Sequence, residues 1–140
     1  MSEWADQYFD AWNSHDPEGV ATHFADDSTY ESVGAGSLFV VKGRDAIMAM
    51  VSALDRYSKD SRIMLLSELH SGDRFVFEME ETGTNTGKVA RGVPATNKRY
   101  TVRLASVGRL DGNGKIIEER VYTDRLDVFT QLGLLTTPGA

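Results

Sequence analysis

The chain has 140 residues and no cysteine, so it suits one domain spanning residues 1–140 and can form neither a disulfide nor a thiolate metal site. Hydrophobic residues make up 41% of the sequence, and the net charge is −6 without any run of basic residues, which argues against a disordered chain and against nucleic acid or an anionic membrane as a partner. No apolar stretch approaches the roughly 20 residues of a membrane span, and no basic residue precedes Lys42, so we expect a cytoplasmic protein without a secretory signal.

The first predicted elements are helices. Trp4, Tyr8 and Trp12 recur at helical spacing, which predicts a first helix over about residues 3–14. A second helix is expected to start after Asp16, which can cap it, followed by a proline at the first helical position.

Next in the chain come two short strands and a third helix. The stretch "DDSTYESV" reads as a strand, and a Gly-rich break, "GAGS", separates it from the apolar run at residues 38–41. Gly43 then precedes a helical pattern whose apolar stripe consists of Ile47, Met50, Val51 and Leu54.

The remainder of the sequence alternates in the manner of strands. "RIMLLSELH" and "RFVFEMEETGT" flank a short turn, "KRYTVRLASVGRL" follows a loop, and "DGNG" turns the chain into "KIIEERVYTD". A closing helix is predicted from about Arg125 to Leu132, with Gly133 as its C-cap. Helices followed by a long antiparallel meander predict an α+β fold, with helices on one face of a bent sheet of four to six strands.

Several segments together resemble the SnoaL-like polyketide cyclase family, in the superfamily named after nuclear transport factor two. They are "YFDAWNSHDPEGVATHFADDSTYES", "GRDAI", "ETGTNTG", "VPATNKR" and "DGNGKIIEERVYTDRLDVFTQLGLL". The resemblance implies a cone-like, cystatin-like α+β barrel, in which a curved, mostly antiparallel sheet encloses an apolar pocket and carries helices on its concave side. It also implies an apolar small-molecule substrate and cofactor-independent cyclase, isomerase or hydrolase chemistry.

The resemblance also points to a catalytic residue. SnoaL-like cyclases carry an acid–base Asp ten residues after the Gly of a "GKI" motif, which corresponds here to Asp124 after Gly114. Tyr122 stands where those cyclases have a His. The Arg-x-Asp motif of limonene epoxide hydrolases is not reproduced, because Arg103 is followed by Leu and Ala.

Asp124 has two interpretations from the residues themselves. It lies where a strand ends and a helix begins, so it is either a helix N-cap or an acid pointing into a pocket. Strand alternation puts Glu118, Arg120, Tyr122 and Asp124 on one face, and the hairpin places Arg103 opposite Tyr122. In the catalytic interpretation, Asp124 takes a proton from a carbon next to a carbonyl, and Tyr122 or Arg103 stabilises the oxyanion. The alternatives are a core tyrosine and a surface ion pair.

Substrate-binding positions are predicted from large apolar residues that could shape a pocket. They are Trp12, Phe24, Tyr30, Phe77 and Met79, although core packing explains each of them equally well.

No metal or cofactor is expected. His15, His23 and His70 are scattered without metal-ligand spacing, and the glycines of "GTNTG" open no clear helix that could cradle a phosphate.

Three classes of function remain open: a small-molecule enzyme, a non-catalytic ligand-binding protein, and an assembly domain. A homodimer is predicted, because the small and apolar side chains of Ala105, Ser106, Val107 and Gly108 would suit close packing between two sheets.

Overall fold

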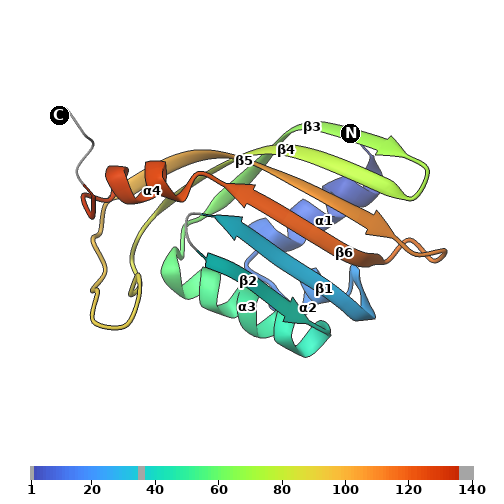
Figure 1. The fold of residues 1–140 in the computed structure, drawn as a ribbon, viewed down its shortest axis with the longest axis horizontal. Helices are drawn as coiled ribbons and strands as arrows, with labels where there is room; N and C mark the ends of the chain where they lie inside the picture. Colours follow the sequence, from blue (N-terminus) through green and yellow to red (C-terminus); the bar gives the residue numbers. More distant parts are fainter. Residues whose placement is uncertain (1, 35–36, 136–140) are drawn as a thin grey trace.

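A six-stranded curved sheet carries four helices in the computed structural model, which describes residues 2–34 and 37–135 (Figure 1). The elements are α1 (Glu3–Asn13), α2 (Pro17–Ala21), β1 (Phe24–Gly34), β2 (Ser37–Lys42), α3 (Arg44–Tyr57), β3 (Arg62–Ser71), β4 (Arg74–Thr84), β5 (Arg99–Leu110), β6 (Ile116–Thr123) and α4 (Arg125–Gln131). The strand order is β2-β1-β6-β5-β4-β3; β1 and β6 run parallel, and the other neighbouring pairs are antiparallel.

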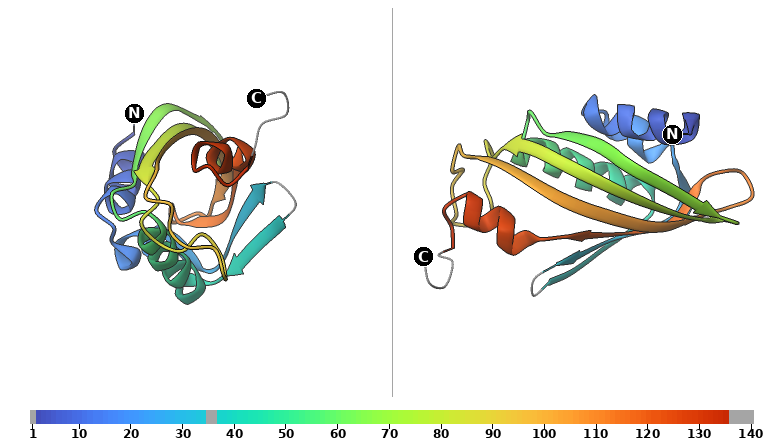
Figure 2. Two further views of the ribbon diagram at one scale, coloured as in Figure 1. Left: turned by 90° about the vertical axis from the view of Figure 1, so that its left-hand side faces the viewer. Right: turned by 90° about the horizontal axis from the view of Figure 1, so that it is seen from above.

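The curvature of the sheet follows from its length and its irregularities. The register shifts between Phe24 and Thr29 in β1, between Leu65 and Ser67 in β3, and near the start of β6, and such bulges bend a strand and increase its twist. Seen from one end, the sheet curls around an axis while its edge strands β2 and β3 stay unpaired with each other (Figure 2). The predicted α+β fold with a curved, mostly antiparallel sheet is therefore confirmed.

The two N-terminal helices form where the sequence predicts them. The Ser2 hydroxyl accepts a hydrogen bond from the backbone N–H of Ala5 at the start of α1. The Asp16 carboxylate accepts one from Gly19 at the start of α2, with Pro17 in the first turn. These side chains satisfy helix N–H groups that have no partner within the helix.

Helix α3 follows Gly43, whose φ of 84° is a conformation that residues with a side chain rarely adopt. Ile47 and Val51 are fully buried, as their helical spacing predicts. Leu54 departs from that prediction: it is 45% exposed and lies at the rim of the cavity described below. The Gly-rich break before β2 includes Ala35 and Gly36, which lie outside the described residues.

Aromatic side chains form the core between α1 and the concave face of the sheet. The rings of Phe75 and Phe77 lie 4.8 Å apart, and Phe9 meets Phe77 edge-on at 5.1 Å. Gly108 on β5 makes room for this cluster, because a Cβ there would collide with the ring of Phe75. The end of the sheet near the turn between β3 and β4 is therefore filled by side chains.

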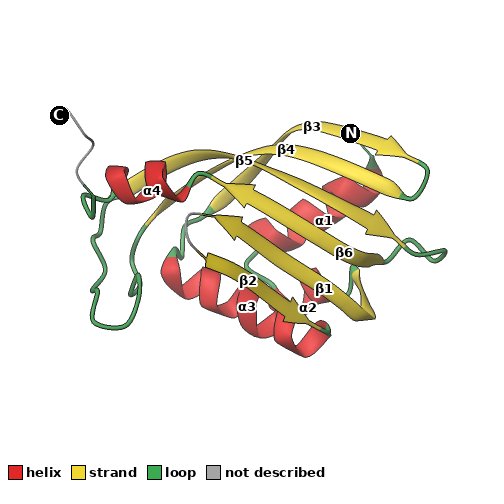
Figure 3. Cartoon of the chain, in the orientation of Figure 1, coloured by secondary structure: helices red, strands yellow, loops and turns green. Residues whose placement is uncertain are grey.

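The other end of the sheet is covered differently. The loop at residues 85–98 lies beside the end of α3, where the N–H groups of Thr86 and Gly87 donate hydrogen bonds to the carbonyl oxygen of Tyr57, and α4 packs against β5 (Figure 3). A second apolar cluster joins α4 to β5 there, and it consists of Tyr100, Val102, Val128 and Leu132. No helix in the described residues is long and apolar enough to span a bilayer.

Candidate active site

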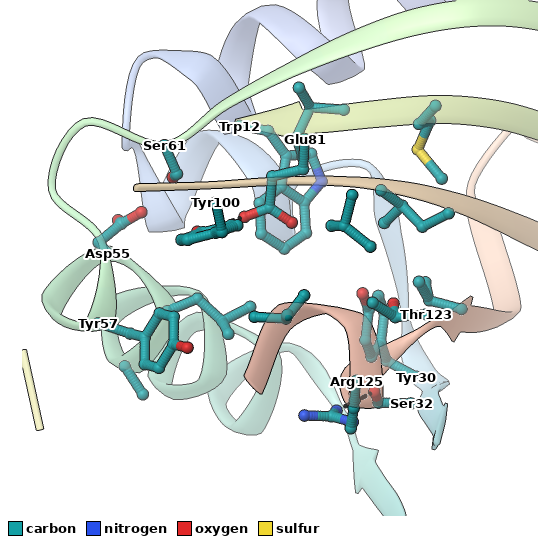
Figure 4. Close-up of a pocket in the computed structure, with 18 of the residues that line it drawn as sticks. Trp12, Tyr30, Ser32, Asp55, Tyr57, Ser61, Glu81, Tyr100, Thr123 and Arg125 are labelled. Atoms are coloured by element: carbon teal, nitrogen blue, oxygen red, sulfur yellow. Dashed lines mark hydrogen bonds between the residues drawn. The ribbon is translucent and has the colours of Figure 1, made fainter. Parts of the chain in front are cut away.

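A cavity of about 430 Å³ lies between the concave face of the sheet and helices α1, α3 and α4 (Figure 4). This is within the usual size range of small-molecule sites. Its walls are mostly apolar and aromatic, and a few polar groups converge on it. The lining includes Tyr8, Trp12, Tyr30, Ser32, Asp55, Tyr57, Met79, Glu81, Lys88, Tyr100, Glu119, Thr123 and Arg125.

Glu119 on β6 is a buried acid in this cavity. Glu119 is only 3% exposed, and the hydroxyl of Tyr8 donates a 2.7 Å hydrogen bond to its Oε2. Burial raises the pKa of Glu119 to about 7, although the hydrogen bond from Tyr8 acts in the opposite direction. A carboxyl with this pKa is present in both protonation states near neutral pH, so it can both accept and return a proton.

A second acid, Glu81 on β4, also lines the cavity. It accepts a 3.0 Å hydrogen bond from the hydroxyl of Tyr100 on β5. Burial raises the pKa of Glu81, and the hydrogen bond from Tyr100 lowers it in part. Figure 4 shows Glu81 and Tyr100 beside each other on one side of the cavity. The cavity thus contains two similar pairs, each a carboxyl with a phenol donor.

A cation lies on the other side of the cavity. Arg125, the first residue of α4, donates a 2.6 Å hydrogen bond from Nη2 to the hydroxyl of Ser32 on β1. Figure 4 shows this pair near Tyr30 and Thr123 and away from Glu81 and Tyr100. Arg125 and Glu81 therefore lie on different sides of the cavity.

Two further phenols line the cavity. Burial raises the pKa of Tyr30 well above its ordinary value and also raises that of Tyr57. Both side chains therefore stay protonated near neutral pH. Neither hydroxyl forms a hydrogen bond with another residue in the described part of the chain, so both can donate to a bound oxygen.

Asp124 is placed as a helix cap. Its carboxylate accepts a 3.0 Å hydrogen bond from the backbone N–H of Asp127 at the start of α4. The residue is exposed and does not line the cavity. The expectation that Asp124 points into the pocket is therefore wrong, and the geometry favours the alternative helix-cap interpretation.

Tyr122 and Arg103 lie on the outer face of the sheet. Tyr122 is 45% exposed, and Arg103 forms a 2.9 Å ion pair with Glu80, its cross-strand neighbour on β4. Both contribute to a shallow outer depression instead of the cavity. The predicted pairing of Arg103 with Tyr122 is also wrong, because Ala105 is the residue opposite Tyr122.

The alternation of β6 explains this inversion. Glu119, Val121 and Thr123 face the cavity, so Tyr122 and Arg120 face outward. The register shift that separates Arg109 from Leu110 changes the phase at the start of β6. Two isoleucines precede the charged residues and are compatible with either phase, so the sequence left the choice of face open.

The predicted pocket-lining residues divide into two groups. Trp12, Tyr30 and Met79 line the cavity. Phe24 and Phe77 are completely buried in the aromatic core and do not line it, because they lie toward the filled end of the sheet.

Several polar residues of the cavity were missed from the sequence: Tyr8, Glu81, Glu119 and Arg125. A charge within a strand ordinarily marks a solvent-facing position, so the two glutamates carried no signal of burial. The helical spacing of Tyr8 predicts only a place in the apolar stripe of α1. One hint is that Val121, an apolar residue suited to the interior, lies on the same face of the strand as Glu119.

No group of three or more His, Asp or Glu side chains in the described residues is arranged to hold a metal ion.

The sequence also identifies the family. Residues 5–119 match the profile of the SnoaL-like domain. The chain belongs to the family of SnoaL-like domains. A search of curated proteins finds no significant match.

Solved structures share the same SnoaL-like fold. TsrD from Streptomyces laurentii aligns with a TM-score of 0.81 and 21% identity, over 95% of this chain and 94% of its own. A protein with a ketosteroid isomerase-like fold from Catenulispora acidiphila, in complex with trimethylamine, aligns with a TM-score of 0.80 and 23% identity over 99% of both chains. A protein assigned as a SnoaL-like polyketide cyclase, from Jannaschia sp. CCS1, aligns with a TM-score of 0.79 and 21% identity, over 96% of this chain and 92% of its own.

Proposed function

We propose that this SnoaL-like protein is a small-molecule enzyme that performs cofactor-independent acid–base chemistry in its cavity, of the cyclase, isomerase or hydrolase type. The observation that carries the proposal is the buried pair of Glu119 and Tyr8, with the pKa of Glu119 raised to about 7. A carboxyl buried in an apolar, concave site and tuned to neutral pH is a typical feature of catalytic acids and bases. This assigns to Glu119 the acid–base role that the sequence suggested for Asp124.

The proposed reaction begins with proton abstraction. The Glu119 carboxylate removes a proton from a carbon next to a substrate carbonyl, and the electron pair of the C–H bond moves onto the carbonyl oxygen as an enolate. The protonated Glu119 then returns the proton to carbon or to the oxygen of the product. Such a group contributes about 10²–10⁴-fold to the rate.

The enolate oxygen requires a hydrogen-bond donor. Tyr30 suits this role, because its hydroxyl lies in the same cavity and the raised pKa keeps it protonated. A neutral donor that is already oriented stabilises the developing charge in a dry site more than water would. Tyr8 is a positioning residue, because its hydrogen bond orients the carboxyl of Glu119 and limits how far its pKa rises.

A deuterium exchange assay tests the proposal and does not require the natural substrate. Apolar ketones and 1,3-dicarbonyl compounds are incubated with the protein in D₂O, and loss of the α-proton signal is followed by NMR. The wild type is expected to accelerate exchange for part of this panel, and Glu119→Gln to lower the rate about 10²–10⁴-fold. Tyr8→Phe is expected to move the rising limb of the pH profile above pH 7, because it removes a hydrogen bond that lowers the pKa of Glu119.

Asp124→Asn is the matched control, because Asn also caps helices and the change leaves the cavity intact. Its exchange rate should equal that of the wild type. If Glu119→Gln exchanges as fast as the wild type, Glu119 is not the base. If the wild type binds compounds of the panel but exchanges none, the alternative function, a non-catalytic small-ligand-binding protein of the same fold, is favoured.

We also propose that two copies of the chain pair through the outer face of the sheet. Exposed apolar side chains support this, among them Met64 at 54% and Tyr122 at 45% exposure. Of the residues that the sequence suggested for this contact, Ala105 and Val107 are only partly buried, whereas Ser106 and Gly108 are buried and face inward. Mass measurement in dilute solution tests the proposal, and a mass near 15.5 kDa at micromolar concentration would reject it.

A further inference from the structure

Arg125 is an incompletely paired charge in the cavity wall. Its guanidinium donates a hydrogen bond from Nη2 to the Ser32 hydroxyl, and its buried Nε has no hydrogen-bond partner among residues 2–34 and 37–135. No carboxylate of the described residues lies within ion-pair distance of it. A buried donor without a partner costs free energy, so the described residues do not fully satisfy the guanidinium, and an anion in the cavity would offset its charge.

The surroundings of Arg125 allow an anion to approach. Burial raises the pKa values of the Tyr30 and Tyr57 hydroxyls, the charge of Glu81, and for Tyr30 also that of Glu119, raises them further, and the positive charge of Arg125 lowers them by a smaller amount. Both phenols are neutral hydrogen-bond donors, so they add to the attraction that the guanidinium exerts on an anionic oxygen.

The other charged groups in the cavity wall restrict where an anion can bind. Glu81 and Glu119 belong to the concave face of the sheet, and Asp55 pairs with His15 at 2.8 Å. Carboxylates repel an anion, so it would have to bind on the side of Arg125, which Figure 4 shows away from Glu81. Lys88 also lines the cavity, from the loop between β4 and β5, but its side chain is exposed.

We infer that Arg125 binds an anionic oxygen group, such as a carboxylate, on an otherwise apolar substrate whose body fills the cavity. The inference rests on the proposed function, in that the anion belongs to the molecule on which Glu119 acts. Arg125 and Glu119 both line the cavity, so an anion bound at Arg125 would hold the apolar body of the substrate in the cavity that contains Glu119. Arg125 is then the residue that selects charged over neutral substrates.

Calorimetric titration of the full chain with 2-naphthoate and with its neutral isostere 2-naphthamide tests this inference. Both probes have the same apolar body, so the difference in affinity isolates the charge. The wild type is expected to bind the carboxylate at least about tenfold more tightly. Arg125→Met should abolish this preference and leave the amide within about twofold, whereas Arg125→Lys should retain part of it. Benzoate and 2-anthroate, with their amides, cover a smaller and a larger body.

Lys88→Met is the matched control, because it removes the exposed cation of the same cavity wall and should preserve the preference for the carboxylate. Equal binding of carboxylate and amide by the wild type overturns the inference, as does the absence of carboxylate binding at millimolar concentration throughout the series. Equal loss for both probes in Arg125→Met, or the same loss in Lys88→Met, also overturns it. These titrations need no turnover, so they can succeed even where deuterium exchange in Glu119→Gln disproves the role of Glu119.

Discussion

Glu118 and Glu119 are neighbours on one strand and have opposite environments. The side chain of Glu118 is 31% exposed and meets two cations, Arg109 at 3.5 Å and Arg120 at 3.9 Å. Glu119 is buried in the cavity wall, where its carboxylate accepts a hydrogen bond from Tyr8 and no cation lies within ion-pair distance in the described structure. The same chemical group is therefore an ordinary surface acid on one face and a candidate acid–base catalyst on the other.

This comparison shows how a sheet separates stability from chemistry. Ion pairs between exposed side chains contribute little to folding, so the outer face tolerates change. A carboxyl on the inner face opposes folding whenever it is charged, because its desolvation is not offset by an opposite charge. Selection for stability alone would not favour Glu119, which strengthens the case for a functional role.

The largest expected difference between the two acids is in the pH dependence of stability. The pKa of Glu119 rises from its ordinary value of 4.5 to about 7 on folding, so the folded state holds an additional proton between these pH values. The contribution of Glu119 to stability is therefore largest below pH 4.5. It falls by on the order of 3 kcal/mol as the pH rises to 7, and it is constant above pH 7. Urea denaturation at pH 5 and pH 8 should show that Glu119→Gln loses this component and Glu118→Gln keeps it. Equal pH dependence of both variants would contradict the buried-acid interpretation.

A smaller effect is expected from a change in backbone packing on the same inner face. Gly108→Ala places a methyl group against the ring of Phe75 and the backbone carbonyl oxygen of Glu118, so we expect a loss of about 1–3 kcal/mol in the free energy of unfolding. Gly112→Ala is the control, because no atom lies within 4 Å of its added Cβ, and it should stay within about 0.5 kcal/mol. Chemical denaturation measures both, and a Gly108→Ala variant as stable as the control would show that the ring and the neighbouring strand adjust to the methyl group without cost.

Removal of the helix cap at Asp124 should lower stability by less than the change at Gly108. Asp124→Ala removes the acceptor for the Asp127 N–H and should cost about 1 kcal/mol, whereas Asp124→Asn should be nearly neutral. Thermal or urea denaturation distinguishes the two. Full stability of the Ala variant would show that the cap is not needed.

The smallest effect is expected on the outer face. Arg103→Met breaks the 2.9 Å ion pair with Glu80, but the arginine side chain is 72% exposed. We therefore expect a change of no more than about 0.5 kcal/mol at physiological salt. A loss above about 2 kcal/mol would mean that this face is buried in solution, as the proposed pairing of two copies requires for at least part of it.

The sequence by itself determined the local structure of this protein. Its helices begin at Ser2 and Asp16 because these side chains satisfy free N–H groups, and α4 ends before Gly133, whose φ is +75°. Strand alternation and the short turn between β3 and β4 indicated a meander, and the family resemblance supplied the curvature of the sheet. These features depend on residues that are close in the chain, so they could be predicted.

The tertiary structure decided which face of β6 points inward, and with it the identity of the candidate catalytic acid. A register shift near Leu110 set the phase of the strand, and α1 brought the hydroxyl of Tyr8 to Glu119 across 111 positions of sequence. Asp124 lies only five residues beyond Glu119 but is exposed. Whether a carboxyl is buried and tuned to neutral pH depends on what the folded chain packs around it, and no local pattern of residue types contains that information.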